Sequence, residues 1–471
     1  IGFRDTRGAL AHLSALASGV SRRAAIHRAL LPVLIQWLAE GADPDYGLLM
    51  FRRLSEALGE THWYLRLLRD SSAAAYRLTK TLSGSRFASE LLDLIPESVA
   101  WLEDDSDLHP RTREQLAEES AAVLARHDDR EDAAAVLRSM RRREVLRLAM
   151  AAILDTCSIK ELALGLTAVT ESHIEALVQL IRTDDEPAAF EFAVIGMGRF
   201  GGSELGMGSD VDVMYVYRSS EADDGAATRA LRIVSELNRL STDPRLPFDL
   251  DPGLRPEGKN GVVARTLDAY RAYYARWSLT WEAQALLRAR PVAGDEALAA
   301  DFEALANEIR YPKAFAEDEK REVRRIKARV ENERLPQGAD PARHLKLGRG
   351  SLSDVEWFVQ LLQLEYGRAV PGLRTTSTLD ALAAAVEAGL VAQADADVLA
   401  DGWVLASRVR TALTLWLNKT TDVLPRDRND LEGIARLMAF PARSASQLEE
   451  EYLATTRRAR AAFERGFYGP G

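Results

Sequence analysis

The sequence has a single cysteine and no long hydrophobic run. Cys157 alone excludes an intramolecular disulfide framework and any cysteine-rich zinc site, and it fits a reducing cytoplasm. The apolar stretch 148–154 stops at Asp155, well short of the ~20 residues that a membrane-spanning helix needs. No stretch has the pattern of a secretory signal peptide. These absences predict a cytoplasmic protein without a membrane partner.

Histidine is also scarce, and negative charges outnumber positive ones. The 7 histidines are dispersed, with no metal-ligand spacing such as H-E-x-x-H, and we interpret them as structural. The net charge is −10, the wrong sign for a protein whose main partner is a nucleic-acid backbone. With 471 residues, 47% of them hydrophobic and 28% charged, the chain is long enough for about three globular domains. It begins with Ile1 rather than methionine, so we expect a piece of a longer polypeptide.

Both ends of the chain are predicted to be helical. In residues 1–165, alternating β-branched residues are scarce, and Leu34, Trp37 and Leu38 recur at the spacing of one buried helical face. The helical pattern returns at about residue 311. There Ser353 and Glu356 have the spacing of a capping box, in which the serine caps the helix and the glutamate bonds back to it.

Two charged runs near the amino terminus are interpreted as solvated faces, because runs of like charge are usually exposed. One is the acidic stretch 103–107. The other comprises four arginines, Arg138, Arg141, Arg142 and Arg143.

The middle of the chain has a different pattern, which begins after a turn-like break at 184–187. The apolar run 190–195 predicts a buried strand, and 211–217 alternates with the period of a second strand. A helical pattern over 226–240 and a strand-like piece over 246–251 follow. Strand, loop, strand, helix and strand in this order indicate a mixed α/β domain.

A glycine-rich segment lies between the first two predicted strands. Gly196, Gly198 and Gly201 form a G-x-G-x-x-G pattern directly after a strand, which suggests a dinucleotide-binding site. That site needs a helix opening at the third glycine and an acid about 20 residues later. Here Asp210 already enters the next strand, so there is no room for the helix and we reject this interpretation.

Two aspartates at the end of the glycine segment suggest a different chemistry. Residues i and i+2 of a strand point to the same side, so Asp210 and Asp212 present their carboxylates together. Like charges held this close favour a cation, and hard oxygen ligands suit magnesium bound together with substrate phosphates. The glycine loop in front offers backbone N–H groups and the hydroxyls of Ser203 and Ser209 to phosphate oxygens. This equipment suits nucleotidyl transfer. A third acid would come from Asp249 or Asp251, between which the spacing does not choose.

The run 196–212 reads Gly-Met-Gly-Arg-Phe-Gly-Gly-Ser-Glu-Leu-Gly-Met-Gly-Ser-Asp-Val-Asp. It resembles the signature of bacterial glutamine-synthetase adenylyltransferases, in the DNA-polymerase-β-like nucleotidyltransferase superfamily. Three further stretches resemble blocks of the same family: 250–256 (Leu-Asp-Pro-Gly-Leu-Arg-Pro), 281–291 (Trp-Glu-Ala-Gln-Ala-Leu-Leu-Arg-Ala-Arg-Pro) and 346–356, which would open its helical domain. The resemblance implies a mainly α, multidomain fold with a central α/β nucleotidyltransferase domain. Helical domains would flank it: 1–165 as a linker or regulatory region, 166–310 as the catalytic domain and 311–471 as a helical bundle.

The resemblance also assigns site residues. It implies Asp210, Asp212 and Asp251 as catalytic residues and metal ligands, and it selects Asp251 over Asp249. The residues expected at the nucleotide phosphates are Arg199, Gly201, Gly202, Ser203, Ser209 and Arg255, with Lys259 and Arg290 as weaker candidates. Many family members have lysine where this chain has Arg199, which keeps the charge but changes its geometry.

The family implies transfer of AMP from ATP to a tyrosine of glutamine synthetase, with release of pyrophosphate and down-regulation of nitrogen assimilation. Two Mg²⁺ ions are expected, with Mn²⁺ as a substitute. Glutamine synthetase is then the protein partner, and the PII signalling protein and glutamine are expected regulators. Family enzymes resemble a tandem duplication with one adenylylating and one adenylyl-removing half. This chain has one catalytic signature, and it looks like the carboxy-terminal, adenylylating half of the actinobacterial type.

Two alternatives remain open at this point. The same acids would serve phosphorolytic removal of AMP from glutamine synthetase. A non-catalytic regulatory module of the same system is the other alternative, although the intact acid set argues against it.

Overall fold

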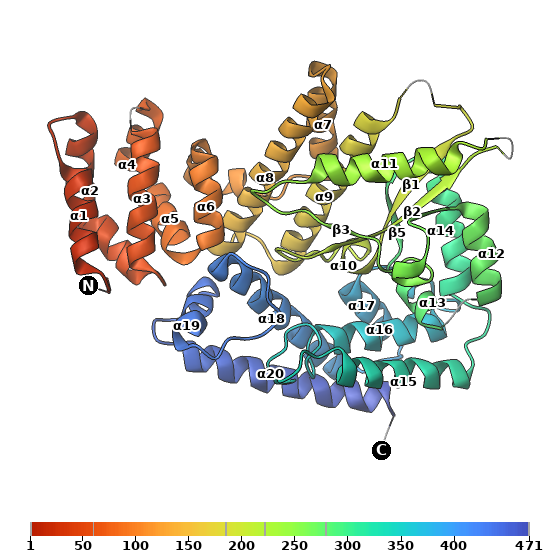
Figure 1. Ribbon diagram of the computed structural model, residues 1–471. Helices are drawn as coiled ribbons and strands as arrows, with labels where there is room; N and C mark the ends of the chain where they lie inside the picture. Colours follow the sequence, from red (N-terminus) through yellow and green to blue (C-terminus); the bar gives the residue numbers. More distant parts are fainter. Residues whose placement is uncertain (1, 60, 184–185, 221–222, 278–279, 470–471) are drawn as a thin grey trace.

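The computed structural model describes residues 2–59, 61–183, 186–220, 223–277 and 280–469 (Figure 1). The predicted fold class is confirmed: the described chain is mainly helical and multidomain, with one small mixed sheet near its middle. Ile1 and half of the predicted break, Asp184 and Asp185, lie outside the described residues. Among the residues that are described, no helix is both long and apolar enough to cross a membrane.

Helices make up the part of the chain before the sheet. Their bounds are α1 (Thr6–Ala17), α2 (Arg22–Glu40), α3 (Pro44–Leu58), α4 (His62–Asp70), α5 (Ser72–Gly84), α6 (Arg86–Leu94), η1 (Pro96–Glu103), η2 (Asp105–Leu108), α7 (Arg113–Arg126), α8 (Arg130–Leu154) and α9 (Ile159–Ile181). The predicted face of α2 is confirmed, because Leu34 and Leu38 are buried and the helix ends at Gly41. Ser158 and Glu161 form a capping box that starts α9.

The sheet is mixed, with strand order β3-β2-β1-β5. Its elements are β1 (Glu191–Gly196), α10 (Gly198–Gly201), β2 (Val211–Arg218), α11 (Ala226–Ser241), β3 (Leu250–Asp251), η3 (Gly258–Asn260), β4 (Ala264–Thr266), α12 (Leu267–Trp277), α13 (Thr280–Leu286), β5 (Arg290–Gly294) and α14 (Glu296–Arg310). The strand β1 is antiparallel to both β2 and β5, whereas β3 and β4 pair in parallel with successive parts of β2. The strand predicted over 246–251 is confirmed only at its last two residues.

Both faces of this sheet are covered by helices, because successive residues of a strand point to opposite sides. Phe192, Val213 and Tyr215 share one hydrophobic core with the amino-terminal helices and α11. Ile195 and Met214 face the other way, into a core with residues of α12 and α14. The sheet is thus enclosed between two helical layers (Figure 1).

A second group of helices follows the sheet. They are α15 (Glu317–Glu333), α16 (Leu352–Tyr366), η4 (Pro371–Leu373), α17 (Thr378–Glu387), α18 (Gln393–Leu417), α19 (Arg428–Leu437) and α20 (Ala445–Phe467). They enclose a core of their own. In Figure 1 these helices lie below the sheet, on the side of α10 and α13.

The predicted capping box at the start of α16 is wrong. Ser351 is the N-cap residue, and Ser353 already lies inside the helix. The Asp354 carboxylate instead accepts a hydrogen bond from the Gly350 N–H at 2.6 Å and forms an ion pair with the buried Lys327, also at 2.6 Å. A charged pair inside the bundle therefore determines where this helix begins, and sequence spacing alone does not reveal such a tertiary contact.

The arginines of α8 do not form a solvated face, contrary to the prediction. Arg138 donates to the Leu240 carbonyl at 2.6 Å, and Arg141 donates to the Leu246 carbonyl at 3.0 Å while its guanidinium lies over the Phe248 ring. Arg142 forms an ion pair with the buried Asp243. These contacts fix the segment that leads from α11 into β3. The acidic stretch 103–107 is exposed, as predicted.

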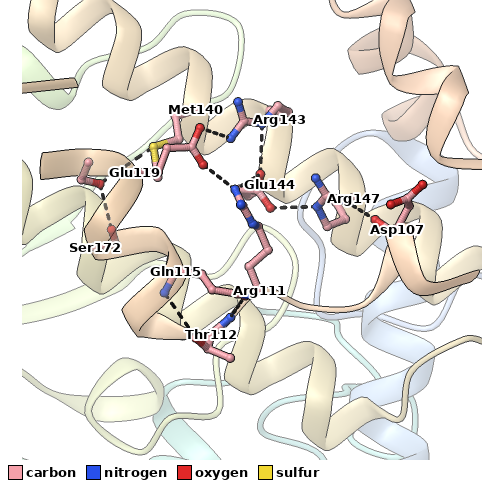
Figure 2. Close-up of polar contacts among 11 residues, drawn as sticks. Asp107, Arg111, Thr112, Gln115, Glu119, Met140, Arg143, Glu144, Arg147 and Ser172 are labelled. Atoms are coloured by element: carbon pink, nitrogen blue, oxygen red, sulfur yellow. Dashed lines mark hydrogen bonds and ion pairs between the residues drawn. The ribbon is translucent and has the colours of Figure 1, made fainter. Parts of the chain in front are cut away.

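The fourth arginine of that run belongs to a charged network that joins η2, α7 and α8 (Figure 2). Glu144 is 1% exposed, and it accepts hydrogen bonds from Arg143 at 3.0 Å and Arg147 at 2.9 Å. Arg147 also lies over the Trp101 ring and donates to the Asp107 carbonyl. Arg111 and Arg143 both bond to Glu119. The buried Glu144 carboxylate therefore holds arginines that connect α8 to η2 and α7.

We expect Glu144→Gln to lower the free energy of unfolding by about 3 kcal/mol, because it leaves the guanidinium groups around it short of a negative charge. Glu119→Gln is the matched control. Its side chain is 29% exposed, so water can take over its role and we expect a loss of about 1 kcal/mol or less. Urea denaturation of both variants measures the difference. Equal losses would contradict the central role of Glu144.

The stability of the protein should also depend on His173. This side chain is 4% exposed beside Phe248, and neither ring nitrogen has a hydrogen-bond partner. Burial, together with the charges of Arg141 and Arg138, lowers the pKa of His173 to about 3. Unfolding restores a pKa of about 6.5, so the unfolded state binds one more proton between these two pH values. Stability must therefore fall as the pH drops below 6.5.

We expect His173→Leu to reduce the pH dependence of the unfolding free energy between pH 6 and 4 by up to about 1.4 kcal/mol per pH unit. Denaturation curves at several pH values measure this slope, even if the variant has a different stability at neutral pH. His62 is exposed, so His62→Gln serves as the control and should leave the slope unchanged. An unchanged slope in His173→Leu would contradict the assignment.

Candidate active site

The predicted acidic residues lie at the ends of two neighbouring strands. In the parallel pair of β2 and β3, Asp212 is the register partner of Asp251, and Asp210 directly precedes β2. Asp210 and Asp251 are exposed and Asp212 is half-buried. The sheet therefore brings Asp212 and Asp251 side by side, with Asp210 two residues before Asp212.

The register also distinguishes between the two aspartates of the β3 segment. Asp249 is exposed and lies before the strand, where its carbonyl accepts a hydrogen bond from the Val211 N–H at 3.3 Å. Asp251 is the one that pairs with Asp212, and its carboxylate accepts a hydrogen bond from the Gly253 N–H at 2.7 Å.

The charges around Asp212 determine its protonation. Burial raises the pKa of Asp212 to about 7, and the negative charges of Asp251 and Asp210 contribute in the same direction. The positive charge of Lys346 opposes them. A carboxyl with this pKa is partly protonated at neutral pH, and a cation bound beside it would restore the charged form. The site is thus suited to receive positive charge.

Asp212 and Asp251 offer the one or two carboxylates with which proteins usually hold Mg²⁺ together with phosphate oxygens and water. Within the described ranges, no group of three or more His, Cys, Asp or Glu side chains is arranged to hold a metal ion. The adjacent carboxylates of Asp212 and Asp251 suit a metal that also binds the phosphates of a substrate.

The glycine segment packs directly against Asp212. Gly198 has a φ of +52°, and a Cβ there would overlap the Asp212 carboxylate. The Met197 N–H donates to the Asp212 carbonyl at 2.8 Å. The segment then forms the single helical turn α10. It is too short for the helix of a dinucleotide-binding site, but one helical turn fits between β1 and β2. Glycine is required here because L side chains rarely adopt this conformation.

The next two glycines are needed for packing. A Cβ at Gly201 would overlap the carbonyl of Arg288, and one at Gly202 would meet its guanidinium at 2.5 Å. Ser203 has a φ of +57°, and with Gly202 it lines a cavity between α9 and the start of α17. These three predicted phosphate ligands therefore lie where α10 meets its neighbours.

Each predicted or candidate arginine of the site has partners within the protein. Arg199 donates to the Glu204 carbonyl at 2.9 Å and lies over the Trp403 ring, and burial lowers its pKa. Arg255 is buried and donates to the carbonyls of Pro252, Lys259 and Gly261, all in its own loop. Arg290 bonds to Glu171 of α9 and donates to the Gly201 carbonyl at 3.1 Å.

The carboxy-terminal helices contact the glycine segment from the other side. The hydroxyl of the predicted ligand Ser209 accepts a hydrogen bond from Arg410 of α18 at 3.0 Å. Glu204 is buried with Arg288, to which it bonds at 2.5 Å, and it accepts the Thr378 N–H at the start of α17, also at 2.5 Å. The segment is thus clamped between two helical parts.

The sequence reasoning missed Lys346 as a site residue. It lies in the segment between α15 and α16, more than 130 residues after Asp212, and belongs to a stretch noted only as a family block. No spacing rule connects a lysine in that segment to a strand aspartate, so the fold alone reveals their proximity.

Comparisons with known proteins give two family matches and several similar relatives. The model of the glutamate-ammonia ligase adenylyltransferase family matches residues 75–305, and that of the GlnD PII-uridylyltransferase family matches residues 321–467. Three relatives carry the name bifunctional glutamine synthetase adenylyltransferase/adenylyl-removing enzyme. They come from Leifsonia xyli subsp. xyli (66% identical, covering 100% of this chain and 47% of the relative), Streptomyces avermitilis (49%, 100% and 49%) and Mycobacterium leprae (43%, 100% and 48%).

The paired acids beside a glycine turn are suited to hold a metal together with substrate phosphates. The chain belongs to the glutamate-ammonia ligase adenylyltransferase family. It spans about half the length of the curated relatives that it matches.

We expect Gly201→Ala to lower the free energy of unfolding by about 1–3 kcal/mol, because the added methyl group overlaps the Arg288 carbonyl and forces α10 away from β5. Gly206→Ala is the control, since its Cβ would meet nothing closer than the Ser209 hydroxyl at 3.3 Å. Thermal and urea denaturation measure both effects. A Gly201→Ala variant with normal stability would contradict the packing role.

Proposed function

We propose that this chain transfers AMP from ATP to a tyrosine of glutamine synthetase, releases pyrophosphate and so down-regulates nitrogen assimilation. The observation that carries the proposal is the register pairing of Asp212 with Asp251 beside the glycine turn. Family membership supports the choice of nucleotide and acceptor, because the relatives are named for adenylylation of glutamine synthetase.

We further propose that Asp210, Asp212 and Asp251 hold Mg²⁺ when ATP is bound, with two ions in the complete site and Mn²⁺ as a substitute. Bound magnesium would neutralise phosphate charge and stabilise the leaving pyrophosphate. The raised pKa of Asp212 supports this assignment, because a carboxyl surrounded by like charges gains most from a cation.

The chain's own residues then position the reactants. The phenol oxygen of the acceptor tyrosine attacks the α-phosphorus, and the bond from that phosphorus to the β-phosphate oxygen breaks. The phenol proton must leave as the new bond forms, because a phenol with a pKa near ~10 is a poor nucleophile at neutral pH. Asp251 is exposed beside Asp212 and is our candidate to receive that proton. The backbone N–H groups of residues 201–203 already donate to carbonyls of the α10 turn, so the Ser203 hydroxyl is our candidate from this turn for a phosphate oxygen.

Several further assignments belong to this proposal. The three-part division into 1–165, 166–310 and 311–471 is one, and correspondence to the carboxy-terminal, adenylylating half of the family enzyme is another. Regulation by the PII protein and glutamine through the helical parts, and a cytoplasmic location, complete it. Phosphorolytic removal of AMP by the same acids is the second candidate function, supported by the bifunctional name of the relatives.

The proposal is tested by incubating the purified chain with α-labelled ATP, Mg²⁺ and unmodified glutamine synthetase, then locating the label by mass spectrometry. Label on a synthetase tyrosine supports adenylylation. Loss of AMP from premodified synthetase in the presence of phosphate, without the forward reaction, supports the opposite half. If the chain neither adds AMP to glutamine synthetase nor removes it, the result supports a regulatory module.

We expect Asp212→Ala to reduce AMP transfer by at least about 100-fold while leaving the fold intact, because it removes the central carboxylate of the site. Asp251→Ala should have a comparable effect, and the effect of Asp249→Ala should be much smaller. Asp268 is exposed on α12, so Asp268→Ala is the matched control. Initial rates and circular dichroism provide the measurements. Wild-type turnover in Asp212→Ala would refute the assignment.

A further inference from the structure

The basic groups near the paired acids differ in whether they are free to contact a substrate. Arg288 bonds to Glu204, Arg290 to Glu171, and Arg410 to Asp422 and Ser209. All three guanidinium nitrogens of Arg255 donate to carbonyls of its own loop. A triphosphate needs cationic partners, but these guanidinium groups already form hydrogen bonds or ion pairs within the protein.

Lys346 is different, and it shares this difference with the exposed Lys259 of η3. The Lys346 side chain is exposed, and among the described residues its ammonium group forms no hydrogen bond and no ion pair within 4.0 Å. An exposed, unpaired ammonium group is available to a phosphate.

A continuous set of contacts ties Lys346 to the site. Ser209, next to Asp210, accepts from Arg410, and Arg410 donates to the Asp422 carboxylate at 2.5 Å. The Asp422 carbonyl in turn accepts the Leu345 N–H at 2.7 Å. Leu345, which precedes Lys346, is therefore linked through Asp422 and Arg410 to Ser209, which precedes Asp210.

The backbone that carries Lys346 is held firmly. The N–H groups of Lys346 and Leu347 both donate to Nδ1 of the buried His344, and the Lys346 carbonyl accepts the Ser353 N–H at 2.9 Å. A Cβ at Gly348 would overlap the His344 carbonyl, and one at Gly350 would overlap the Thr456 carbonyl of α20. An exposed lysine on so tightly packed a segment is presented in a defined place, which lowers the entropy cost of binding a ligand.

We propose that Lys346 binds the β- or γ-phosphate of ATP, so that the carboxy-terminal helical part completes the nucleotide site. This inference rests on the proposed function. The ammonium group is unpaired when the nucleotide is absent and contacts a phosphate oxygen when it is bound. Lysine suits this role because its compact charge is a common phosphate partner that needs no bidentate geometry.

The test compares the binding of ATP and AMP, each with Mg²⁺, to the wild-type chain and to Lys346→Gln by isothermal titration calorimetry. We expect Lys346→Gln to weaken ATP roughly 10-fold or more, the loss of one hydrogen bond to a charged group, and to leave AMP within about 2-fold. Lys346→Arg keeps the charge and should recover part of the ATP affinity. Lys313→Gln removes another exposed lysine, outside the site, and is the matched control.

The outcomes separate the two proposals. Equal affinity of wild type and Lys346→Gln for ATP would overturn the role of Lys346 and leave the proposed function intact. Equal weakening of ATP and AMP would also overturn it, because the effect would not lie at the β- and γ-phosphates. If the wild-type chain transfers no AMP and binds no ATP, the proposed function itself fails. Thermal melting of each variant checks that it is folded.

Discussion

The candidate site depends on holding two like charges, Asp212 and Asp251, next to each other on paired strands. Carboxylates in register repel one another, and the sheet must keep them together against that repulsion. The hydrogen bonds of β2 and β3 fix the backbones, and the Gly198 turn closes over Asp212 where no larger residue fits. Burial, reinforced by the neighbouring carboxylates, disfavours the charged form of Asp212, and this makes the site receptive to a cation.

The glycine segment is the point where helices from before and after the sheet meet. From the amino-terminal helices, Glu171 reaches it through Arg290, whereas Thr378 and Arg410 reach it from the carboxy-terminal helices. Its glycines therefore allow neighbouring groups to pack closely against the segment from several sides. A signal that moved either helical part would act on this segment directly, which gives the proposed regulation a physical route.

Much of this architecture could be predicted from the sequence, because local patterns reveal local structure. Alternation over 211–217 and the apolar run 190–195 locate the central strands, and the glycine run with Asp210 and Asp212 locates the candidate site. The errors concern side chains whose partners lie far along the chain. Arg141 and Arg142 are buried against the segment before β3, and Asp354 pairs with Lys327, so neither the arginine run nor the helix start follows from spacing. Lys346 was missed for the same reason.

The bond between Ser209 and Arg410 joins positions 201 residues apart. At a synthesis rate of about 5–20 residues per second, the ribosome needs roughly 10–40 s to make the chain between them. The strands and α9 can collapse on each other during that interval, since they are near neighbours in sequence. The glycine segment meanwhile lacks its carboxy-terminal partners. In the nascent protein, the strands that carry the acids can therefore form early. The site is complete only after the later helices have docked, which delays any activity until then.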